Sequence, residues 1–137
     1  MVVNRGLEHV LLVEDDELDQ ENIIRAFKKK NISNPLHIAN DGVEALNMLL
    51  GKNGYQALSP TPSMMLLDIN MPRMNGIELL ARCREIPALS DVLVFILTTS
   101  DSLKDFKQAQ DLNVAGYLLK PIQDADFVST MARLDKC

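Results

Sequence analysis

Short apolar runs alternate along this chain with stretches whose apolar residues recur at helical spacing. Runs such as HVLLV, MMLL and VLVFIL are typical of strands buried on both faces of a parallel sheet, although periodicity alone does not exclude a helix. The pattern predicts five strands, at residues 7–13, 36–39, 64–68, 92–97 and 114–119. They alternate with five predicted helices, at residues 18–30, 43–50, 77–86, 103–112 and 124–134. In the first of these, the residues that recur at helical spacing are Leu18, Asn22, Ile23, Ala26 and Phe27.

Regular alternation of strands and helices predicts a parallel sheet covered on both faces, with right-handed crossovers. The sequence therefore favours the α/β class, as a doubly wound five-stranded parallel sheet with strand order 2-1-3-4-5, which is the flavodoxin-like fold. Residues 1–137 are expected to form a single domain. In that strand order the winding reverses between strands 1 and 3, and ligands bind there at the carboxyl ends of the strands.

The segment MMLLDINMPRMNG, residues 64–76, ends a predicted strand and begins a loop. Pro72 prevents regular continuation of the chain, so Asp68 lies where the buried strand ends. A carboxylate at that position is costly in a core and useful at a ligand crevice. It is equally consistent with an Asp that begins a turn or caps the next helix. This segment alone leaves both interpretations open.

The first predicted strand ends in four consecutive acids, Glu14, Asp15, Asp16 and Glu17. At ~5 Å and an effective dielectric near 20, each contact between like charges costs on the order of 3 kcal/mol. Capping of the following helix, whose N-terminus favours negative charge, explains Asp16 and Glu17 well. It explains Glu14 and Asp15 less well, because they still belong to the strand end.

Composition narrows the function classes. Of 137 residues 47% are hydrophobic and the net charge is -5, which indicates a globular domain and argues against nucleic-acid binding. The basic run at residues 28–30 falls at a predicted helix end, where the helix dipole explains it. The sequence shows no membrane span and no signal peptide, and its two cysteines favour a reducing cytoplasm. Cys83 is predicted to be an inert core thiol. His9 and His37 are each expected to stand alone in or beside a strand, and so are not expected to bind a metal.

Polar side chains follow four of the predicted strands. Strand 1 ends in Glu14 and Asp15, strand 3 in Asp68, strand 4 in Thr98 and strand 5 in Lys120. Thr98 alone could cap a helix and Lys120 alone could be a solvated surface lysine. Because the carboxyl ends of parallel strands meet at one edge of the sheet, all of them together predict a shared pocket.

The residue types indicate the chemistry of such a pocket. Three converging carboxylates require a hard divalent cation, and oxygen ligands suit Mg²⁺. Asp68 could keep one oxygen free as a nucleophile. Phosphoryl transfer asks a protein mainly for positioning and charge neutralisation, which Mg²⁺, the Lys120 ammonium and the Thr98 hydroxyl could supply.

The motifs LLVEDD, LLDINMPRMNG, FILTTS and GYLLKP, in this order and at these spacings, resemble the receiver domains of two-component response regulators. The resemblance implies that Asp68 accepts a phosphoryl group from a histidine kinase or phosphorelay histidine. Asp15 would bind Mg²⁺ directly and Glu14 would complete the acidic pair. By the same resemblance, the main-chain carbonyl of Asn70 is a further metal ligand, Thr98 and Tyr117 are the switch pair, and Lys120 binds the phosphoryl group.

Within that family, the long connection before the third strand and the wording of PRMNG, LTTS and GYLLKP resemble stand-alone regulators associated with bacterial phytochromes. This implies a cytoplasmic, single-domain phosphoprotein with no output module. It would catalyse only its own phosphorylation and dephosphorylation. By this resemblance its partners would be a histidine kinase, for which the phytochrome type is one candidate, and a protein that binds the surface formed by helix 4, strand 5 and helix 5. It could be a monomer or a homodimer.

Two other classes share parts of this pattern. A pseudo-receiver is a binding module that is never phosphorylated, although every site position here carries a competent residue. A Mg²⁺-dependent phosphatase that forms an aspartyl-phosphate usually has a second Asp two residues after the nucleophile, and Asn70 stands at that position.

Overall fold

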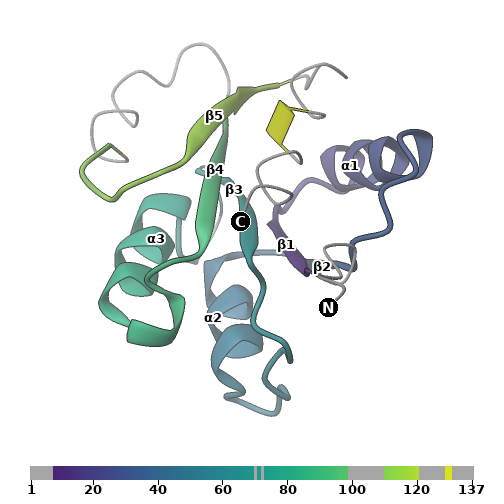
Figure 1. Ribbon diagram of the computed structural model, residues 1–137. Helices are drawn as coiled ribbons and strands as arrows, with labels where there is room; N and C mark the ends of the chain where they lie inside the picture. Colours follow the sequence, from purple (N-terminus) through teal and green to yellow (C-terminus); the bar gives the residue numbers. More distant parts are fainter. Residues whose placement is uncertain (1–7, 70, 72, 99–109, 121–128, 131–137) are drawn as a thin grey trace, which may run out of the picture.

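The computed structural model describes residues 8–69, 71, 73–98, 110–120 and 129–130. Its five strands form one parallel sheet in the order β2-β1-β3-β4-β5, which confirms the predicted fold (Figure 1). The strands are β1 Val10–Val13, β2 Leu36–Ala39, β3 Met64–Asp68, β4 Leu93–Thr98 and β5 Gly116–Leu119. The helices are α1 Glu17–Lys29, α2 Gly42–Leu50 and α3 Gly76–Glu85, followed by a short 3₁₀ helix, Pro87–Leu89. The predicted helices at 103–112 and 124–134 lie largely outside the described residues.

Helices cover both faces of the sheet. α1 packs on one face through Ile23 and Phe27, against Val10, Leu12 and Leu66. On the other face, α2 and α3 bury a second cluster, to which they contribute Ala45, Leu49, Leu79, Leu80 and Cys83 (Figure 1). β1 and β3 are buried along their whole length, as their continuous apolar runs predict. Cys83 is fully buried, and burial raises the pKa of its thiol to about 11, which fits an inert core residue.

Polar caps fix where the helices begin. The Asp16 carboxylate accepts hydrogen bonds from the backbone N–H groups of Leu18 and Asp19, which confirms the capping interpretation of this acid. Asp41 caps α2 by accepting from the N–H of Glu44. Asn75 caps α3 in a reciprocal arrangement with Glu78. Because Asn75 performs that role, Asp68 is not needed as a helix cap.

Gly76 lets α3 begin directly against the end of β3. A Cβ atom at this position would lie 2.4 Å from the backbone oxygen of Asp68 and 2.9 Å from Cα of Ile69. Both neighbours are backbone atoms and cannot rotate away, so a glycine is required for this close approach. The first turn of α3 therefore fixes the backbone that carries Asp68.

Arg84, near the end of α3, joins three segments of the chain. Its guanidinium donates hydrogen bonds to the carbonyl oxygens of Ser90 and Val92, before β4, and of Leu112 and Asn113, before β5. An arginine fork is suited to several carbonyls at once. This contact holds the approach to β5, and hence the strand that carries Lys120, against α3.

Two sequence expectations need correction. The helical spacing predicts that Leu18 faces the core with Ile23 and Phe27, yet it lies 63% exposed at the start of α1. The core-facing stripe of α1 instead continues from Phe27 and Ile23 to Asp19 at four-residue spacing. The fourth strand runs from Leu93 to Thr98, one residue later than expected, so Thr98 belongs to its end. Among the described residues, no helix has the length and hydropathy needed to cross a membrane.

Candidate functional site

A pocket of about 220 Å³ opens at the carboxyl ends of the strands. β1 leads directly into its acidic run, β3 ends in Asp68, β4 ends in Thr98, and Lys120 follows β5. The backbone N–H of Lys120 donates to the carbonyl oxygen of Thr98 at 2.8 Å, which aligns the last two strand ends. The residues that line the pocket are Glu14, Asp15, Asp16, Asp19, Asp68, Thr98 and Lys120.

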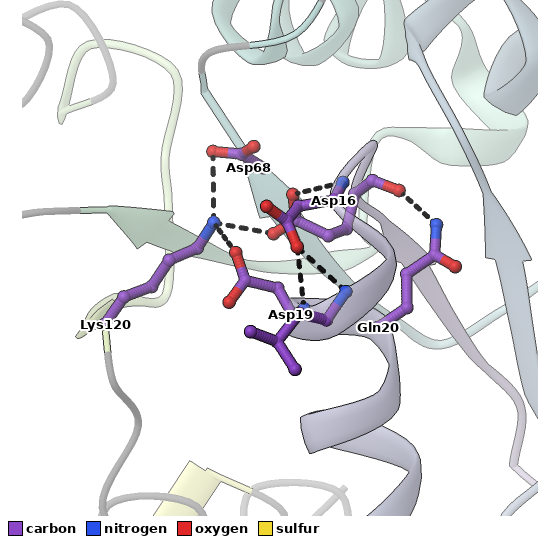
Figure 2. A network of polar contacts seen from close by, with 7 residues as sticks. Asp16, Asp19, Gln20, Asp68 and Lys120 are labelled. Carbon is purple, nitrogen blue, oxygen red and sulfur yellow. Dashed lines mark hydrogen bonds and ion pairs between the residues drawn. The ribbon is translucent and has the colours of Figure 1, made fainter.

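Lys120 is the cation that joins these acids. Its Nζ donates hydrogen bonds to Glu14 Oε1 at 2.7 Å and to Asp19 Oδ2 at 2.9 Å, and lies 3.7 Å from Asp68 Oδ1 (Figure 2). Its side chain is 18% exposed, so it is not the solvated surface lysine that the sequence left open. Burial lowers the pKa of Lys120, but the hydrogen bonds to Glu14 and Asp19, together with the negative charges of Asp68 and Glu14, outweigh this effect and the net shift is upward. The ammonium therefore stays charged.

Glu14 is fully buried, and its carboxyl group has a strongly shifted pKa. Burial raises the pKa of Glu14 to about 8, with a further upward contribution from Asp68 and an opposing one from the hydrogen bond with Lys120. The Lys120 ammonium thus does not fully offset the burial of Glu14 and the negative charge of Asp68 beside it. A pocket in this state favours the binding of additional positive charge.

Three carboxylates meet the geometric requirement for a metal site. Glu14, Asp15 and Asp68 each offer an oxygen, and these oxygens lie within 4.8 Å of one another. Glu14 and Asp68 are buried while Asp15 is exposed, which leaves the site open to solvent on one side. An all-oxygen donor set with room for water fits a hard divalent cation. The residues present therefore fit the expected metal.

Hydrogen bonds hold the acidic loop in place. Gln20 Nε2, on α1, donates to the carbonyl oxygen of Glu14 at 2.6 Å (Figure 2). It also donates to Asn40 Oδ1 at 2.9 Å. The backbone N–H of Asp16 donates to Glu14 Oε2. These contacts fix the backbone and the side chain of Glu14 before any cation binds.

A second ion pair anchors the loop after Asp68. Arg73 donates to both carboxylate oxygens of Asp41, at 2.9 and 3.0 Å. Burial raises the pKa of Asp41, but the hydrogen bond and charge of Arg73, together with the backbone N–H groups of Glu44 and Val43, outweigh it, so the net shift is downward. The loop between β3 and α3 is thereby attached to the start of α2, next to the acidic loop.

Most residues expected at the site from the sequence share the pocket. Glu14, Asp15, Asp68, Thr98 and Lys120 all line it. Asn70 lies outside the described residues. Tyr117 does not line the pocket, but lies half-buried against the core on the α2 and α3 face, where burial raises its pKa.

Asp19 is a pocket residue that sequence reasoning missed. It precedes Ile23 and Phe27 by one and two four-residue steps, so the three side chains share one face of α1. Since Ile23 and Phe27 are buried against the sheet, this spacing was the signal that Asp19 faces the strand ends.

The two histidines are not alone, which corrects the sequence expectation. His9 Nδ1 and His37 Nε2 are hydrogen bonded at 2.8 Å, and the two rings stack with centroids 5.0 Å apart. His37 lies in β2 and His9 directly precedes β1, so the parallel register brings them together. The pair lies at the amino ends of these strands, opposite the pocket.

The His9–His37 pair predicts a pH dependence of stability. Burial first, and then His9, lower the pKa of His37 from its usual 6.5. The stability that His37 contributes is therefore complete above pH 6.5 and is lost as pH falls through the lower, folded-state pKa. We expect the free energy of unfolding, measured in urea on both sides of pH 6.5, to fall more steeply with decreasing pH in the parent than in His37→Gln. Glu14, whose pKa is raised, contributes stability that falls as pH rises, and it does so in both proteins. An equal pH dependence of the free energy of unfolding in the parent and in His37→Gln would contradict the prediction.

Comparison with known proteins gives one family and several relatives. Residues 10–132 match the family model described as the response regulator receiver domain. The response regulator Rcp1 of Synechocystis is 36% identical over 111 residues, which cover 81% of this chain and 75% of Rcp1. The solved Mn²⁺-bound form of Rcp1 aligns with a TM-score of 0.77 at 30% identity, over 94% of this chain and 92% of Rcp1.

Two further solved structures are similar. A two-component response regulator from Legionella pneumophila has a TM-score of 0.86 at 35% identity, and the alignment covers 95% of this chain and 99% of that protein. The bacteriophytochrome response regulator RtBRR has a TM-score of 0.83 at 33% identity, and the alignment covers 93% of this chain and 78% of RtBRR.

Proposed function

Because this chain belongs to the response regulator receiver domain family, we propose that it accepts a phosphoryl group on Asp68 from a histidine kinase, in a reaction that requires Mg²⁺. The likeness to phytochrome-associated regulators, predicted from the sequence, is confirmed by the bacteriophytochrome response regulator RtBRR at 33% identity. A kinase of the phytochrome type is therefore the proposed donor. The observation that carries the proposal is the pocket in which Lys120 bridges the acids of β1 and β3.

The proposed chemistry follows from the contacts. An oxygen of Asp68 attacks the phosphorus atom of phosphohistidine, the P–N bond breaks, and the imidazole leaves with the bonding electrons and takes up a proton. The ammonium of Lys120, 3.7 Å from Asp68 Oδ1, is placed to donate to a phosphoryl oxygen beside that carboxylate. Mg²⁺, when bound, would neutralise the carboxylates and a phosphoryl oxygen. Glu14, Asp15 and Asp68 are its proposed side-chain ligands, with the main-chain carbonyl of Asn70 as a further one.

The proposed output is a change of surface around β5. A phosphoryl group adds about -2 charge beside Thr98, whose hydroxyl gains a strong acceptor. Thr98 and Tyr117 lie on adjacent strands, where Thr98 pairs with Leu119 and Tyr117 with Ile96. Movement of Thr98 would make room for the Tyr117 ring and alter the surface that a downstream protein reads. Coupling between two such sites is typically about 1–3 kcal/mol.

Uptake of phosphate from acetyl phosphate tests this function. The protein should acquire acid-labile phosphate when Mg²⁺ is present, and the uptake should stop when the cation is chelated. Intact-mass spectrometry measures the label, and borohydride trapping followed by peptide mapping locates it. A protein that binds Mg²⁺ but never takes up the label would instead be a non-phosphorylated binding module. Continuous release of phosphate from other phosphomonoesters would favour the phosphatase class.

A further inference from the structure

We propose that Asp19 competes with the phosphoryl group for Lys120, and that it thereby limits how fully and for how long Asp68 stays phosphorylated. This inference rests on the proposed function and concerns a residue to which the sequence assigned no role. Asp19 is a positioning residue in this account, because it acts through Lys120 and not on the reacting atoms.

The competition follows from where the ammonium is held: 2.9 Å from Asp19 Oδ2 but 3.7 Å from Asp68 Oδ1. Lys120 Nζ has three N–H groups, of which one is bonded to Glu14 and one to Asp19. The distance to Asp68 Oδ1, 3.7 Å, is too long for a hydrogen bond. The lysine thus lies nearer to Asp19 than to the proposed phosphoryl acceptor (Figure 2).

Glu14 and Asp19 differ in what else they can do. Glu14 belongs to the group of carboxylates that can share a cation, whereas Asp19 does not. A cation would therefore neutralise Glu14 and leave the negative charge of Asp19 beside Lys120. The incoming phosphoryl group would then meet an anion that already holds its cationic partner, and the two anions would also repel each other.

The position of Asp19 is set by the helix and not by a mobile loop. Its backbone N–H is bonded to the Asp16 carboxylate in the first turn of α1. Its side chain lies on the same face as Ile23 and Phe27, which are buried against the sheet. The Asp19 side chain is 33% exposed, so water can solvate its carboxylate when the ion pair with Lys120 breaks. The free-energy cost of breaking this ion pair is therefore moderate. This fits a residue that weakens phosphorylation without preventing it.

Asp19→Asn tests the inference. In saturating Mg²⁺, we expect the variant to bind beryllofluoride, which stands in for the phosphoryl group, about fivefold more tightly than the parent. Phosphate loaded from acetyl phosphate should persist about fivefold longer by the same reasoning. Without beryllofluoride, Mg²⁺ affinity should not rise, because an acid has been removed from the pocket. Isothermal titration calorimetry measures both affinities.

Two control variants distinguish competition for Lys120 from a general effect of charge on the pocket. Asp19→Glu retains the charge and should behave like the parent. Glu21→Gln removes one negative charge from the same helix, where Glu21 is 62% exposed and pairs only loosely with Arg25 at 3.9 Å, so it should also behave like the parent. Loosening of the pocket in Asp19→Asn would weaken both Mg²⁺ and beryllofluoride, which is the opposite of the expected beryllofluoride result.

Unchanged or weaker beryllofluoride binding by Asp19→Asn, in a series where the parent binds it, would overturn the role of Asp19 and leave the proposed function intact. Failure of the parent to bind beryllofluoride in Mg²⁺ would instead overturn the proposed function, and the role of Asp19 with it.

Discussion

Asp68→Asn is expected to lose the uptake of acid-labile phosphate from acetyl phosphate, by more than about a hundredfold, while the chain stays folded. The carboxamide has the same shape as the carboxylate, but its oxygen lacks the charge that makes Asp68 a nucleophile. Asp68 is only 6% exposed and lies among other acids, so removing its charge relieves repulsion in the absence of a cation. Intact-mass spectrometry of the parent and the variant, incubated side by side, measures the difference.

Asp91→Asn is the matched control for this experiment. Asp91 is exposed in the turn before β4, at the opposite end of the sheet from the pocket, and its variant should be labelled like the parent. Thermal unfolding followed by circular dichroism checks that Asp68→Asn is folded. Persistent labelling of a folded Asp68→Asn protein would show that another residue accepts the phosphoryl group.

Asp15→Asn is expected to weaken Mg²⁺ binding by at least about tenfold, because it removes a charged ligand from a set of three carboxylates. Asp15 is the exposed member of the set, so the change leaves no buried group without a partner and should not affect folding. Isothermal titration of Mg²⁺ into the parent and the variant gives the ratio of the two dissociation constants.

Glu17→Gln provides the comparison for the metal experiment. Glu17 belongs to the same acidic run and is exposed, but it lies in the first turn of α1 and does not line the pocket. The loss of one charge at Glu17 should change Mg²⁺ affinity far less than its loss at Asp15. If Asp15→Asn bound Mg²⁺ as tightly as the parent, the cation would have to lie elsewhere.

The sequence was sufficient to predict the sheet and the convergence of the pocket residues. Continuous apolar runs mark strands buried on both faces, and parallel strands place their carboxyl ends at one edge. Glu14, Asp15, Asp68, Thr98 and Lys120 could therefore be assigned to one pocket without knowledge of any contact.

What the sequence did not predict depends on register and on helix orientation. The His9–His37 bond exists because β1 and β2 pair with Val10 opposite Leu36, a register that no local pattern specifies. The spacing places Leu18 on the core-facing side of the helix, whereas in the structure Leu18 is exposed and Asp19 shares the face of Ile23 and Phe27. The four carbonyls that Arg84 binds come from segments that approach α3 only in the folded chain.

The central claim is that one cation, Asp68 and Lys120 act together on a phosphoryl group. A crystal structure of the protein with Mg²⁺ and beryllofluoride tests it most directly. We expect a cation at ~2.1 Å from oxygens of Asp15 and Asp68, beryllium bonded to the other oxygen of Asp68, and the Lys120 ammonium in contact with a fluorine. A cation away from these carboxylates, or beryllium bonded to a different side chain, would contradict the claim.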